Sequence, residues 1–371
     1  MQQPIRILHL FTILNRGGAE TNVMNYYRKL DKTKFQFDFV VHREENGAYE
    51  EEILELGGRI FRFSPIHPFR LKKYKQQIQT FFQEHQYSII HGQCSELGYF
   101  FYKEAYKRGV PVIIAHAHNA NPKFDLKLIG RLILKKMMLK YVNTYFSCSY
   151  EASVWFFGKK NISKVFTMTN AIQSDIFRYS KASDNSFRDK MKIKDSKNIV
   201  HIGRFCEQKN HNFIIDVFYC LNKKDEHYKL FLIGEGELKE LIQKKVCEMG
   251  MSEKVFFLGL RDDVNQLLQA MDVFLFPSLF EGLGIAFIEA QASGVKCVIS
   301  DEIPKEAILI PENVSVISLK KSAQRWADTI HLLELSEKRD VSSLIQEKGY
   351  DIDSNVRILE DKYTALLQKN K

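Results

Sequence analysis

Short runs of β-branched and aromatic residues alternate along the chain with longer segments whose apolar residues recur every three or four positions. A run of the first kind is typical of a buried strand, and a segment of the second kind predicts an amphipathic helix. Alternating strands and helices imply a parallel sheet covered by helices. In the first half of the chain the predicted strands are 5–11, 35–41, 59–63, 88–91, 112–116, 144–149 and 164–168, and the predicted helices are 19–30, 71–85, 96–107 and 126–141.

The alternation is interrupted once, from about 174 to 197, where the sequence turns polar and loses its apolar runs. A chain of 371 residues is too long for one ordinary core, and roughly 150 residues per domain suggests two. The second half of the chain contains predicted strands at 198–203, 229–234, 255–259, 273–276, 296–300 and 314–318.

The sequence therefore predicts the α/β fold class, with two Rossmann-like, doubly wound parallel-sheet domains that face each other across an interdomain cleft. We expect the domains to comprise residues 1–173 and 174–350. The segment 351–371 is expected to form a C-terminal helix that packs back on the N-terminal domain.

Composition narrows the class of protein. The net charge of +9 lies in the first half: residues 1–175 hold 25 Lys/Arg against 15 Asp/Glu, and the rest hold 29 against 30. The six cysteines form no Cys-x-x-Cys pair, which indicates free thiols in a reducing compartment. The first apolar run is broken by Arg6 and His9 and reads as a strand rather than a signal peptide, and no apolar run approaches the 18 residues of a spanning helix.

Candidate site residues follow the predicted strands of the N-terminal domain, where ligands bind in open α/β sheets. In "NRGGAE", Gly17 and Gly18 allow close approach of the backbone to a ligand and leave helix N–H groups for an anion, although a tight turn would use the same glycines. His116 and His118 lie at the end of the predicted strand 112–116 and are expected at the mouth of the cleft. A structural role for a histidine there is the alternative, and zinc is not expected because no third ligand lies nearby.

In the second domain "IGRFCEQKNH" places Arg204 just after a strand and Lys209 five residues later. Two such cations can clamp a diphosphate from two sides, whereas the alternative is a pair of solvated surface charges. Gly234, in a glycine turn after another strand, is expected to line a pocket for a nucleobase. Asp262 and Asp263 suggest helix capping rather than a metal site.

The segment "FEGLGIAFIEAQASG" places Glu281 in a loop and Glu289 on the helix that follows. The two acids fall on different faces, so they cannot act as the paired carboxylates of a glycosidase. The spacing suits a long ligand, in which the backbone N–H groups of Leu283, Gly284 and Ile285 bind a diphosphate and the two acids bind hydroxyls on either side. A nucleotide sugar has this layout, and the alternative is that Glu281 caps the helix and Glu289 pairs with a cation.

The last two segments carry a family resemblance. "FEGLGIAFIEAQASG" resembles the Glu-x7-Glu signature of retaining GT-B-fold glycosyltransferases of family 4, and "GRFCEQKN" resembles their Gly-Arg and Lys-Asn segment. "GGAE" and "HAHN" are similar to the N-terminal domain of that family, especially of bacterial enzymes that build capsule or exopolysaccharide. The likeness covers nearly the whole chain, with Ala171 and Gly284 at positions where glycine and proline are common in the family.

The resemblance implies the roles of the site residues. Arg204 and Lys209 would bind the donor diphosphate, Glu289 the ribose, and Glu281 and His118 the transferred sugar, with the Gly17–Gly18 loop close to the donor. It implies retention of the anomeric configuration without a dedicated general base, and no metal or other cofactor is expected. We expect a hexose or N-acetylhexosamine to pass from a nucleotide-diphosphate sugar, with UDP as the expected nucleotide, to a lipid-linked or glycan acceptor.

The basic segments of the first domain suggest where the protein works. Residues 126–141 mix Leu, Ile and Met with Lys127, Arg131, Lys135, Lys136 and Lys140, and 69–77 adds further cations. Basic amphipathic helices can lie on anionic lipid, so we expect peripheral contact at the inner, cytoplasmic face of the plasma membrane. The alternative is a core-facing helix with a solvated basic side, and nucleic acid is not expected because no aromatic platform accompanies the charges.

Other functions stay open at this point. A GT-B-fold UDP-sugar epimerase would use the same donor clamp without an acceptor. A non-catalytic nucleotide-sugar or glycan binding protein would keep the fold alone. A dehydrogenase is the weakest option, since "NRGGAE" lacks the spaced glycines of the dinucleotide fingerprint.

Overall fold

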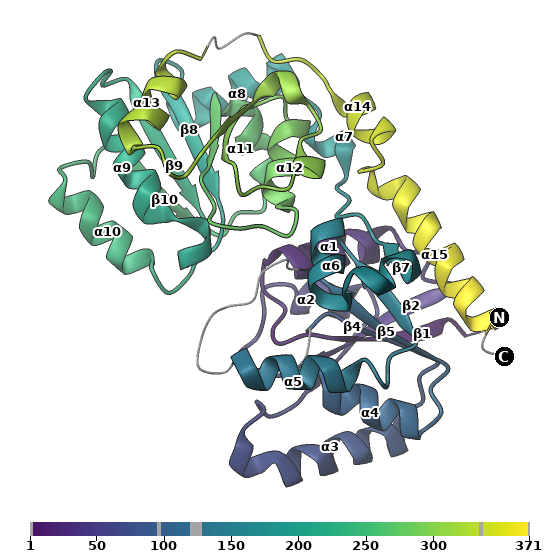
Figure 1. The fold of residues 1–371 in the computed structure, drawn as a ribbon. Coiled ribbons are helices and arrows are strands. Elements are labelled where there is room, and N and C mark those ends of the chain that lie inside the picture. The colour runs from purple at the N-terminus through teal and green to yellow at the C-terminus, as the bar shows by residue number, and fades with distance from the viewer. Residues whose placement is uncertain (1–2, 95–97, 119–127, 334–336, 370–371) are drawn as a thin grey trace. The chain divides into compact units, whose positions relative to one another are not determined.

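The computed structural model describes residues 3–94, 98–118, 128–333 and 337–369. The chain forms two compact units (Figure 1). Unit 1 comprises Met1–Ala171 together with Ile352–Lys371, and unit 2 comprises Ile172–Asp351. Each predicted strand is present in the structure, with ends within two residues of the prediction.

Unit 1 is built on a seven-stranded sheet in the order β3-β2-β1-β4-β5-β6-β7, in which every pair is parallel. Its strands are β1 (Ile5–Leu10), β2 (Phe35–Val41), β3 (Arg59–Arg62), β4 (Ile89–Gly92), β5 (Val112–Ala117), β6 (Thr144–Ser147) and β7 (Val165–Thr167). Its helices are α1 (Gly18–Lys29), α2 (Glu50–Glu55), α3 (Leu71–Glu84), α4 (Tyr99–Lys107), α5 (Leu128–Met138), α6 (Tyr150–Phe157) and α15 (Ile352–Lys369), with short 3-10 helices η1 (Pro68–Arg70) and η3 (Lys159–Lys164).

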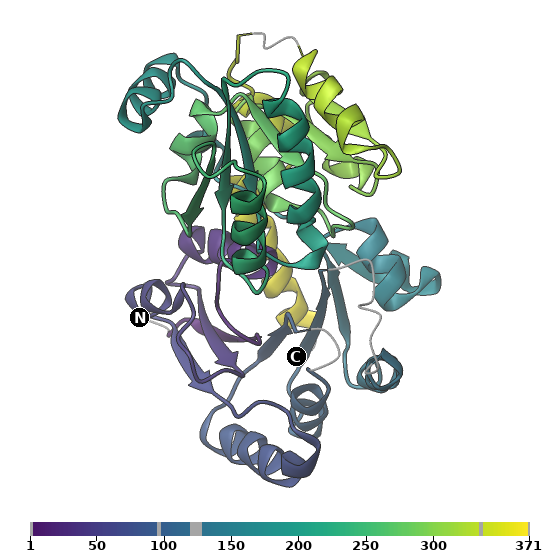
Figure 2. The ribbon, with the colours of Figure 1, turned by 90° about the vertical axis from the view of Figure 1, so that its left-hand side faces the viewer.

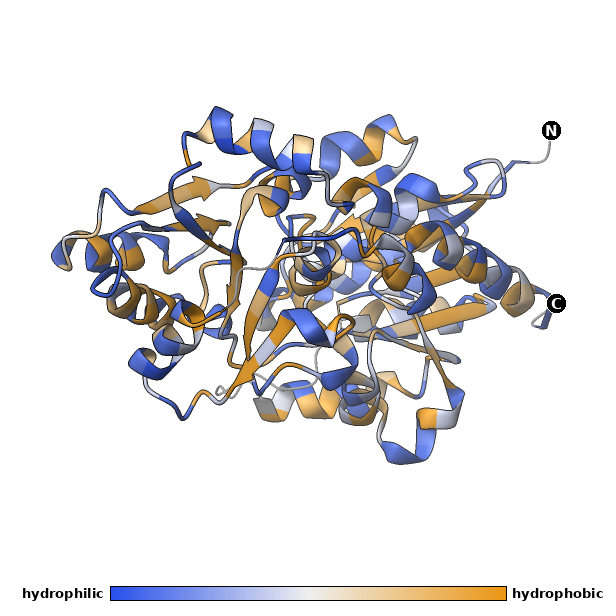
Figure 3. Cartoon of the chain, turned by 90° about the horizontal axis from the view of Figure 1, so that it is seen from above, coloured by the Kyte–Doolittle hydropathy of each residue, from blue (hydrophilic) through white to orange (hydrophobic). Residues whose placement is uncertain are grey.

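Both faces of the central strands are buried, which explains why apolar residues occur on both faces of these strands. On β1, Ile7 belongs to the core under α1 and α15, and Leu8 belongs to the core under α3, α4 and α6. Figure 2 shows helices on both sides of the strands, and Figure 3 shows strands that are mostly hydrophobic between helices of mixed hydropathy. The C-terminal helix α15 contributes Tyr363, which is fully buried in the first of these cores.

Unit 2 has the same architecture, with a six-stranded parallel sheet in the order β10-β9-β8-β11-β12-β13. Its strands are β8 (Lys197–Ile202), β9 (Tyr228–Ile233), β10 (Val255–Gly259), β11 (Val273–Phe276), β12 (Lys296–Ser300) and β13 (Val314–Ile317). Its helices are α7 (Ser174–Phe177), α8 (Lys181–Met191), α9 (His211–Asn222), α10 (Lys239–Glu248), α11 (Val264–Ala270), α12 (Ile285–Ala292), α13 (Ala323–His331) and α14 (Ser342–Glu347), with 3-10 helices η4 (Glu207–Lys209), η5 (Lys305–Ala307) and η6 (Pro311–Asn313).

The strand order of each sheet reverses at one point, between β1 and β4 in unit 1 and between β8 and β11 in unit 2. At such a switch point the connections after the two neighbouring strands leave in opposite directions, so a crevice opens at their carboxyl ends and ligands bind there. The loops after β1 and β4, and those after β8 and β11, are therefore the places to look for a site.

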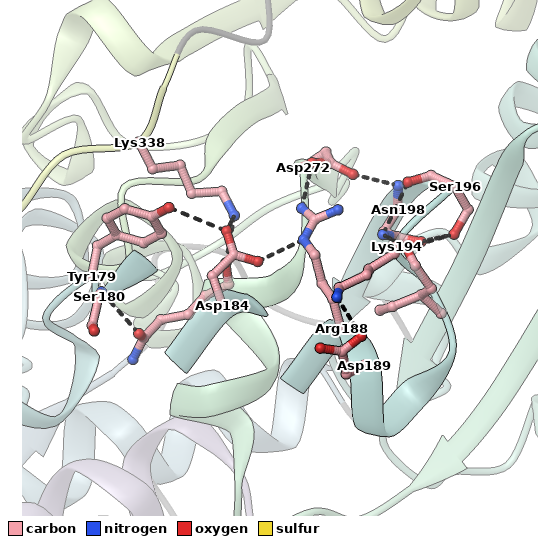
Figure 4. A network of polar contacts seen from close by, with 12 residues as sticks. Tyr179, Ser180, Asp184, Arg188, Asp189, Lys194, Ser196, Asn198, Asp272 and Lys338 are labelled. Carbon is pink, nitrogen blue, oxygen red and sulfur yellow. Dashed lines mark hydrogen bonds and ion pairs between the residues drawn. The ribbon is translucent and has the colours of Figure 1, made fainter. Parts of the chain in front are cut away.

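Helix α8 lies in the polar segment that the sequence pattern treated as an interruption, so that interpretation was wrong in detail. The helix buries Phe187 as its large apolar side chain and is otherwise held by charges. Arg188 donates to Asp184 and to Asp272, each at 2.6 Å, and Asp272 also accepts the backbone N–H of Asn198 at 2.7 Å (Figure 4). Because ion pairs replace an apolar stripe here, the helical period is weak in the sequence.

Candidate functional site

The loop after β8 in unit 2 is fastened to the loop after β11 by hydrogen bonds. The backbone oxygen of Gln208 accepts from Leu279, and the Gln208 side chain donates to the backbone oxygen of Phe280 at 2.9 Å. Asn210 donates to the backbone oxygen of Pro277 at 3.1 Å. Asn210 has a left-handed backbone with φ of 56°, a conformation that asparagine tolerates better than most residues. This explains why asparagine suits the position after Lys209.

Lys209 and Glu281 meet at this junction. The Lys209 Nζ lies 2.5 Å from Glu281 Oε1 and 4.7 Å from the ring centre of Phe276. The two side chains are only 16% and 6% exposed, so both charges are largely withdrawn from water. The sequence predicted each residue as a ligand contact, but it did not predict that they pair with each other.

Arg204 is placed differently from Lys209. Its side chain is 72% exposed and forms an ion pair with Glu237 at 3.0 Å. The structure therefore does not bring Arg204 and Lys209 into one buried pair of cations, and the clamp predicted for them stays a prediction.

The turn before α12 has the backbone that the sequence suggested. Gly284 is the N-cap of α12 with φ of 82°, in the left-handed region, and a Cβ there would lie 3.2 Å from the Phe276 ring. Leu283 is buried beside it, and Ile285 begins the helix. The first N–H groups of a helix have no partner within it, so this end of α12 can bind an anion.

Glu289 lies one turn into α12 and is partly buried. Glu281 precedes the helix, as predicted, and no side chain caps the helix at Gly284. The alternative in which Glu281 caps α12 is therefore not what the structure has, since Glu281 pairs with Lys209 instead.

Gly234 follows β9 and touches the end of β8. A Cβ on Gly234 would lie 2.2 Å from the backbone oxygen of Gly203, and the φ of 140° at Gly234 also favours glycine. The residue thus permits close approach of two strand ends, and its predicted contact with a nucleobase stays a prediction.

Asp263 occupies the N-cap position of α11, but its side chain makes no capping hydrogen bond. Its carboxylate instead accepts from Arg261, with Nε to Oδ1 at 2.7 Å, and this contact holds the pKa of Asp263 below its ordinary value. The predicted capping role was wrong because a nearby guanidinium offers two charge-assisted bonds.

In unit 1, Gly17 is the N-cap of α1 and Gly18 is its first residue. A Cβ on Gly18 would meet no atom within 4 Å among the described residues. The start of α1 is therefore open at Gly18, as the predicted approach of a ligand requires.

The carboxyl ends of β1, β4 and β5 carry a group of polar side chains, four imidazoles and one amide, that we call the histidine cluster: His9, His91, Gln93, His116 and His118. His91 Nε2 lies 3.1 Å from His116 Nδ1, and His118 Nε2 lies 2.6 Å from Gln93 Oε1. Gln93 Nε2 lies 3.2 Å from His9 Nδ1. The Tyr363 hydroxyl of α15 lies 2.7 Å from His91 Nδ1.

The predicted histidines differ in position. His116 lies inside β5 and is 1% exposed, so the expectation that it sits at the mouth of a cleft was wrong. His118 lies just after the strand and is partly exposed, with its ring centre 4.1 Å from that of His116. Burial lowers the pKa of His118 to about 4 and that of His9 to about 3, so both are neutral at pH 7.

The sequence interpretation missed His9, His91 and Gln93. Each lies near the end of a strand, and the parallel register sets His9 opposite His91. A polar residue near the carboxyl end of three apolar strands was the available signal. It points to a cluster only when the strands are known to be neighbours.

The basic surface of unit 1 differs in part from its prediction. Lys135 turns inward, where its Nζ donates to the backbone oxygen of Trp155 at 2.6 Å, and Lys127 lies outside the described residues. In their place α5 exposes an apolar strip that we call the α5 strip. It comprises Ile129, Leu132, Ile133 and Met137.

Helix α5 packs against α4, and α4 also packs against α3. Phe69, just before α3, is 94% exposed and is followed by the exposed side chains of Arg70, Lys72 and Lys73.

In the part of the chain that the structure describes, no helix has the length and hydrophobicity needed to cross a bilayer. Over the same residues, no group of three His, Cys, Asp or Glu side chains is arranged to hold a metal ion.

Comparison with known families gives two matches that together span most of the chain. Residues 16–176 match the model of glycosyltransferase family 4, and residues 183–348 match that of glycosyl transferases group 1. A putative glycosyltransferase EpsF of Bacillus subtilis is 32% identical over 375 residues, covering 98% of each chain. The capsular polysaccharide biosynthesis glycosyltransferase CapH of Staphylococcus aureus is 23% identical, covering 97% of this chain and 99% of its own.

A solved structure has a similar fold. Anabaena Alr3699/HepE, crystallised in complex with UDP-glucose, superposes with a TM-score of 0.73 at 15% identity, covering 99% of this chain and 98% of its own. Two parallel α/β units of this kind are the GT-B arrangement, so the predicted fold class is confirmed.

Proposed function

Because the chain belongs to the GT-B-fold glycosyltransferases of family 4, we propose that it is a retaining enzyme acting on a nucleotide-diphosphate sugar. It moves a hexose or N-acetylhexosamine, with UDP as the expected carrier, to a lipid-linked or glycan acceptor in cell-surface polysaccharide biosynthesis. The observation that carries the proposal is the largely buried Lys209–Glu281 ion pair beside the uncapped N-terminus of α12, at the switch point of the second sheet. EpsF and CapH support the polysaccharide setting by their names, and the UDP-glucose complex of HepE supports the donor class.

In this proposal the charges of unit 2 hold the donor. The ammonium of Lys209 has three N–H donors, so it can keep Glu281 and still donate to a phosphate oxygen. The N–H groups at Leu283, Gly284 and Ile285 bind the diphosphate at the start of α12, and exposed Arg204 reaches it from the surface. Glu289 accepts from the ribose hydroxyls. Gly234 lies close to the nucleobase.

The chemistry needs stabilisation of a leaving diphosphate more than it needs a base. In same-face attack the leaving phosphate oxygen takes the proton of the acceptor hydroxyl as the glycosidic bond forms. Lys209 and the α12 N–H groups stabilise the charge that develops on that phosphate, which makes a metal unnecessary. Glu281 and His118 hold hydroxyls of the transferred sugar, and the Gly17–Gly18 loop lies close to the donor.

The decisive test uses the purified protein, UDP-glucose, UDP-galactose, UDP-N-acetylglucosamine and GDP-mannose. We expect one UDP-sugar to raise the melting temperature, since a ligand at 100 times its Kd stabilises by about 2.7 kcal/mol. With an acceptor lipid fraction, the same sugar should be transferred without metal and with its anomeric configuration retained, as NMR of the product reports. Conversion of the sugar without acceptor would identify an epimerase, and binding without any transfer would identify a binding protein.

A pair of matched variants separates donor binding from loss of a surface ion pair. Arg204 pairs with Glu237, and Lys181 of α8 pairs with Glu337 at 2.8 Å with an equally exposed side chain. Arg204→Ala should weaken donor binding at least tenfold, whereas Lys181→Ala should leave it unchanged, and neither should change the melting temperature measurably because exposed ion pairs contribute little to stability. Equal donor affinity in the two variants would remove Arg204 from the donor site.

We also propose that unit 1 rests on anionic lipid at the cytoplasmic face of the plasma membrane. The α5 strip supplies apolar side chains, and Arg70, Lys72 and Lys73 beside Phe69 supply positive charge. An amphipathic surface of this composition binds lipid by burying apolar area and by attraction to anionic headgroups.

Cosedimentation with phosphatidylglycerol vesicles tests the contact. Ile129→Ser with Ile133→Ser should reduce the bound fraction severalfold, because two side chains that are 73% and 55% exposed no longer enter the lipid. The matched control is Leu54→Ser with Ile358→Ser, at similarly exposed positions on α2 and α15. Equal binding by the two double variants, or equal binding to neutral vesicles, would contradict the proposal.

A further inference from the structure

Gln93 occupies a bridging position in the histidine cluster. Its backbone N–H donates to Leu10 of β1 at 3.0 Å, which fixes the main chain after β4. Its side-chain amide lies between two rings, with Oε1 at 2.6 Å from His118 Nε2 and Nε2 at 3.2 Å from His9 Nδ1. The residue is 6% exposed, so water does not compete freely for these bonds.

An amide has one accepting end and one donating end, so its orientation decides which nitrogen of each neighbouring imidazole carries the proton. When Oε1 faces His118, the proton must be on His118 Nε2. When Nε2 faces His9, the lone pair must be on His9 Nδ1 and the proton on His9 Nε2. The reversed amide would invert both assignments.

The structure has the amide in the first of these orientations. Oε1 of Gln93 lies 2.6 Å from His118 Nε2, and Nε2 of Gln93 lies 3.2 Å from His9 Nδ1. The His9 proton is then on Nε2, which has no hydrogen-bond partner among the described residues.

The groups around His118 leave it neutral in this tautomer. His116 of β5 stacks on it at 4.1 Å, Gln93 bonds to its Nε2, and the Cys148 thiol after β6 donates to its backbone oxygen at 3.4 Å. Among the described residues, His91 of β4 and His9 of β1 are further titratable groups of the same cluster, and both are buried. Among the described residues no hydrogen bond is formed by His118 Nδ1.

We infer that Gln93 is a positioning residue that holds His118 as the neutral Nε2–H tautomer, so that Nδ1 offers a lone pair to a hydroxyl of the bound sugar. The inference rests on the proposed function for the identity of that hydroxyl. It specifies the chemistry of the contact: the sugar donates and His118 accepts. A donor sugar in which fluorine replaces that hydroxyl keeps an acceptor but loses the proton, and it should therefore bind poorly.

Nitrogen NMR of the full chain labelled with ¹⁵N-histidine tests the tautomer directly at pH 7. The signals that disappear in His118→Asn identify His118. We expect a protonated Nε2 and an unprotonated Nδ1. A protonated Nδ1 or a charged ring would overturn the inference, whether or not the protein transfers a sugar.

Variants of Gln93 test the positioning role. Gln93→Met has a similar volume without the amide and should mix the two tautomers and lower kcat about tenfold. Gln93→Glu should raise the pKa of His118, because a carboxylate stabilises the imidazolium, and should move the acid limb of the kcat/KM profile to higher pH by at least one unit. These shifts in tautomer and pH profile are not expected from a merely structural residue.

Tyr363→Phe is the matched control. It removes the 2.7 Å hydrogen bond to His91 within the same cluster but touches neither Gln93 nor His118. The His118 signals and the pH profile should stay as in the wild type. If Gln93→Met changes no more than Tyr363→Phe does, the positioning role is refuted; if only the activity readings fail while the tautomer follows Gln93, it is the proposed function that fails.

Discussion

Below pH 6.5 the free energy of unfolding is expected to fall steeply, before most carboxylates begin to titrate. The cause is a set of buried histidines whose pKa values burial lowers. These are His9, His91 and His116 in unit 1 and His201 and His211 in unit 2, each at most 1% exposed.

The sign follows from proton linkage. In the folded state the pKa of His9 and of His211 is about 3, whereas an unfolded histidine titrates near about 6.5. Between these values the unfolded chain binds more protons, so stability is present above pH 6.5 and is lost as the pH falls. At pH 5 His9 and His211 each cost about 2 kcal/mol. His91, His116 and His201, whose pKa values burial also lowers, add to the loss in the same direction.

Urea unfolding between pH 8 and pH 4.5 measures this loss, and His211→Phe isolates one contribution. His211 stacks on Phe205 with ring centres 4.0 Å apart, and neither of its ring nitrogens has a hydrogen-bond partner among the described residues. The substitution therefore breaks no hydrogen bond, and it removes one histidine whose pKa is lowered in the folded state. The variant should match the wild type within about 1 kcal/mol at pH 8 and exceed it by about 2 kcal/mol at pH 5. An unchanged difference across this range would contradict the argument.

The parts of the fold that the sequence predicts well are those in which both faces of an element are buried and at least one face is apolar. All seven residues of β2 are buried, so its sequence "FQFDFVV" reads as a strand without knowledge of its neighbours. Glycine positions were equally informative, because the left-handed backbone at Gly284 is a local property. Helix α8 was not predicted because its contacts are ion pairs made with distant residues such as Asp272.

The site was predicted as single residues and not as contacts. Lys209 and Glu281 were each chosen because they follow a strand, but they are 72 residues apart and their pairing depends on β8 lying next to β11. Gln93 and His9 are 84 residues apart and meet only because β4 lies beside β1. Sheet order is a tertiary property, so a reading of local pattern cannot supply either contact.

The second large effect is expected when one partner of the Lys209–Glu281 pair is removed. Lys209→Met leaves the Glu281 carboxylate withdrawn from water without its cation, and Gln208, whose amide is 3.4 Å away, is a weak substitute. Breaking a buried pair in this way costs about 3 kcal/mol or more. The double variant Lys209→Met with Glu281→Gln removes both charges and should recover stability to within about 1 kcal/mol of the wild type, since desolvation of the pair offsets its attraction.

Transfer activity should respond differently. Lys209→Met, Glu281→Gln and the double variant are each expected to lose at least a hundredfold in kcat/KM. Under the proposed function Lys209→Met removes the ammonium that stabilises the leaving phosphate, and Glu281→Gln removes the carboxylate that holds the transferred sugar. Lys245→Met is the matched control, since Lys245 also lies 2.5 Å from its partner Asp216 in unit 2, where the carboxylate is 39% exposed. It should cost under about 1 kcal/mol and leave transfer unchanged.

Urea unfolding and initial-rate measurements on these variants separate the two roles of the pair. A double variant as unstable as Lys209→Met would mean that the contact of the Lys209 ammonium with the Phe276 ring matters more than the ion pair with Glu281. A double variant that is stable and fully active would remove both residues from the donor site. Recovery of stability without recovery of transfer is the outcome that the geometry of this junction predicts, because water exclusion makes each charge depend on the other while the chemistry depends on the cation itself.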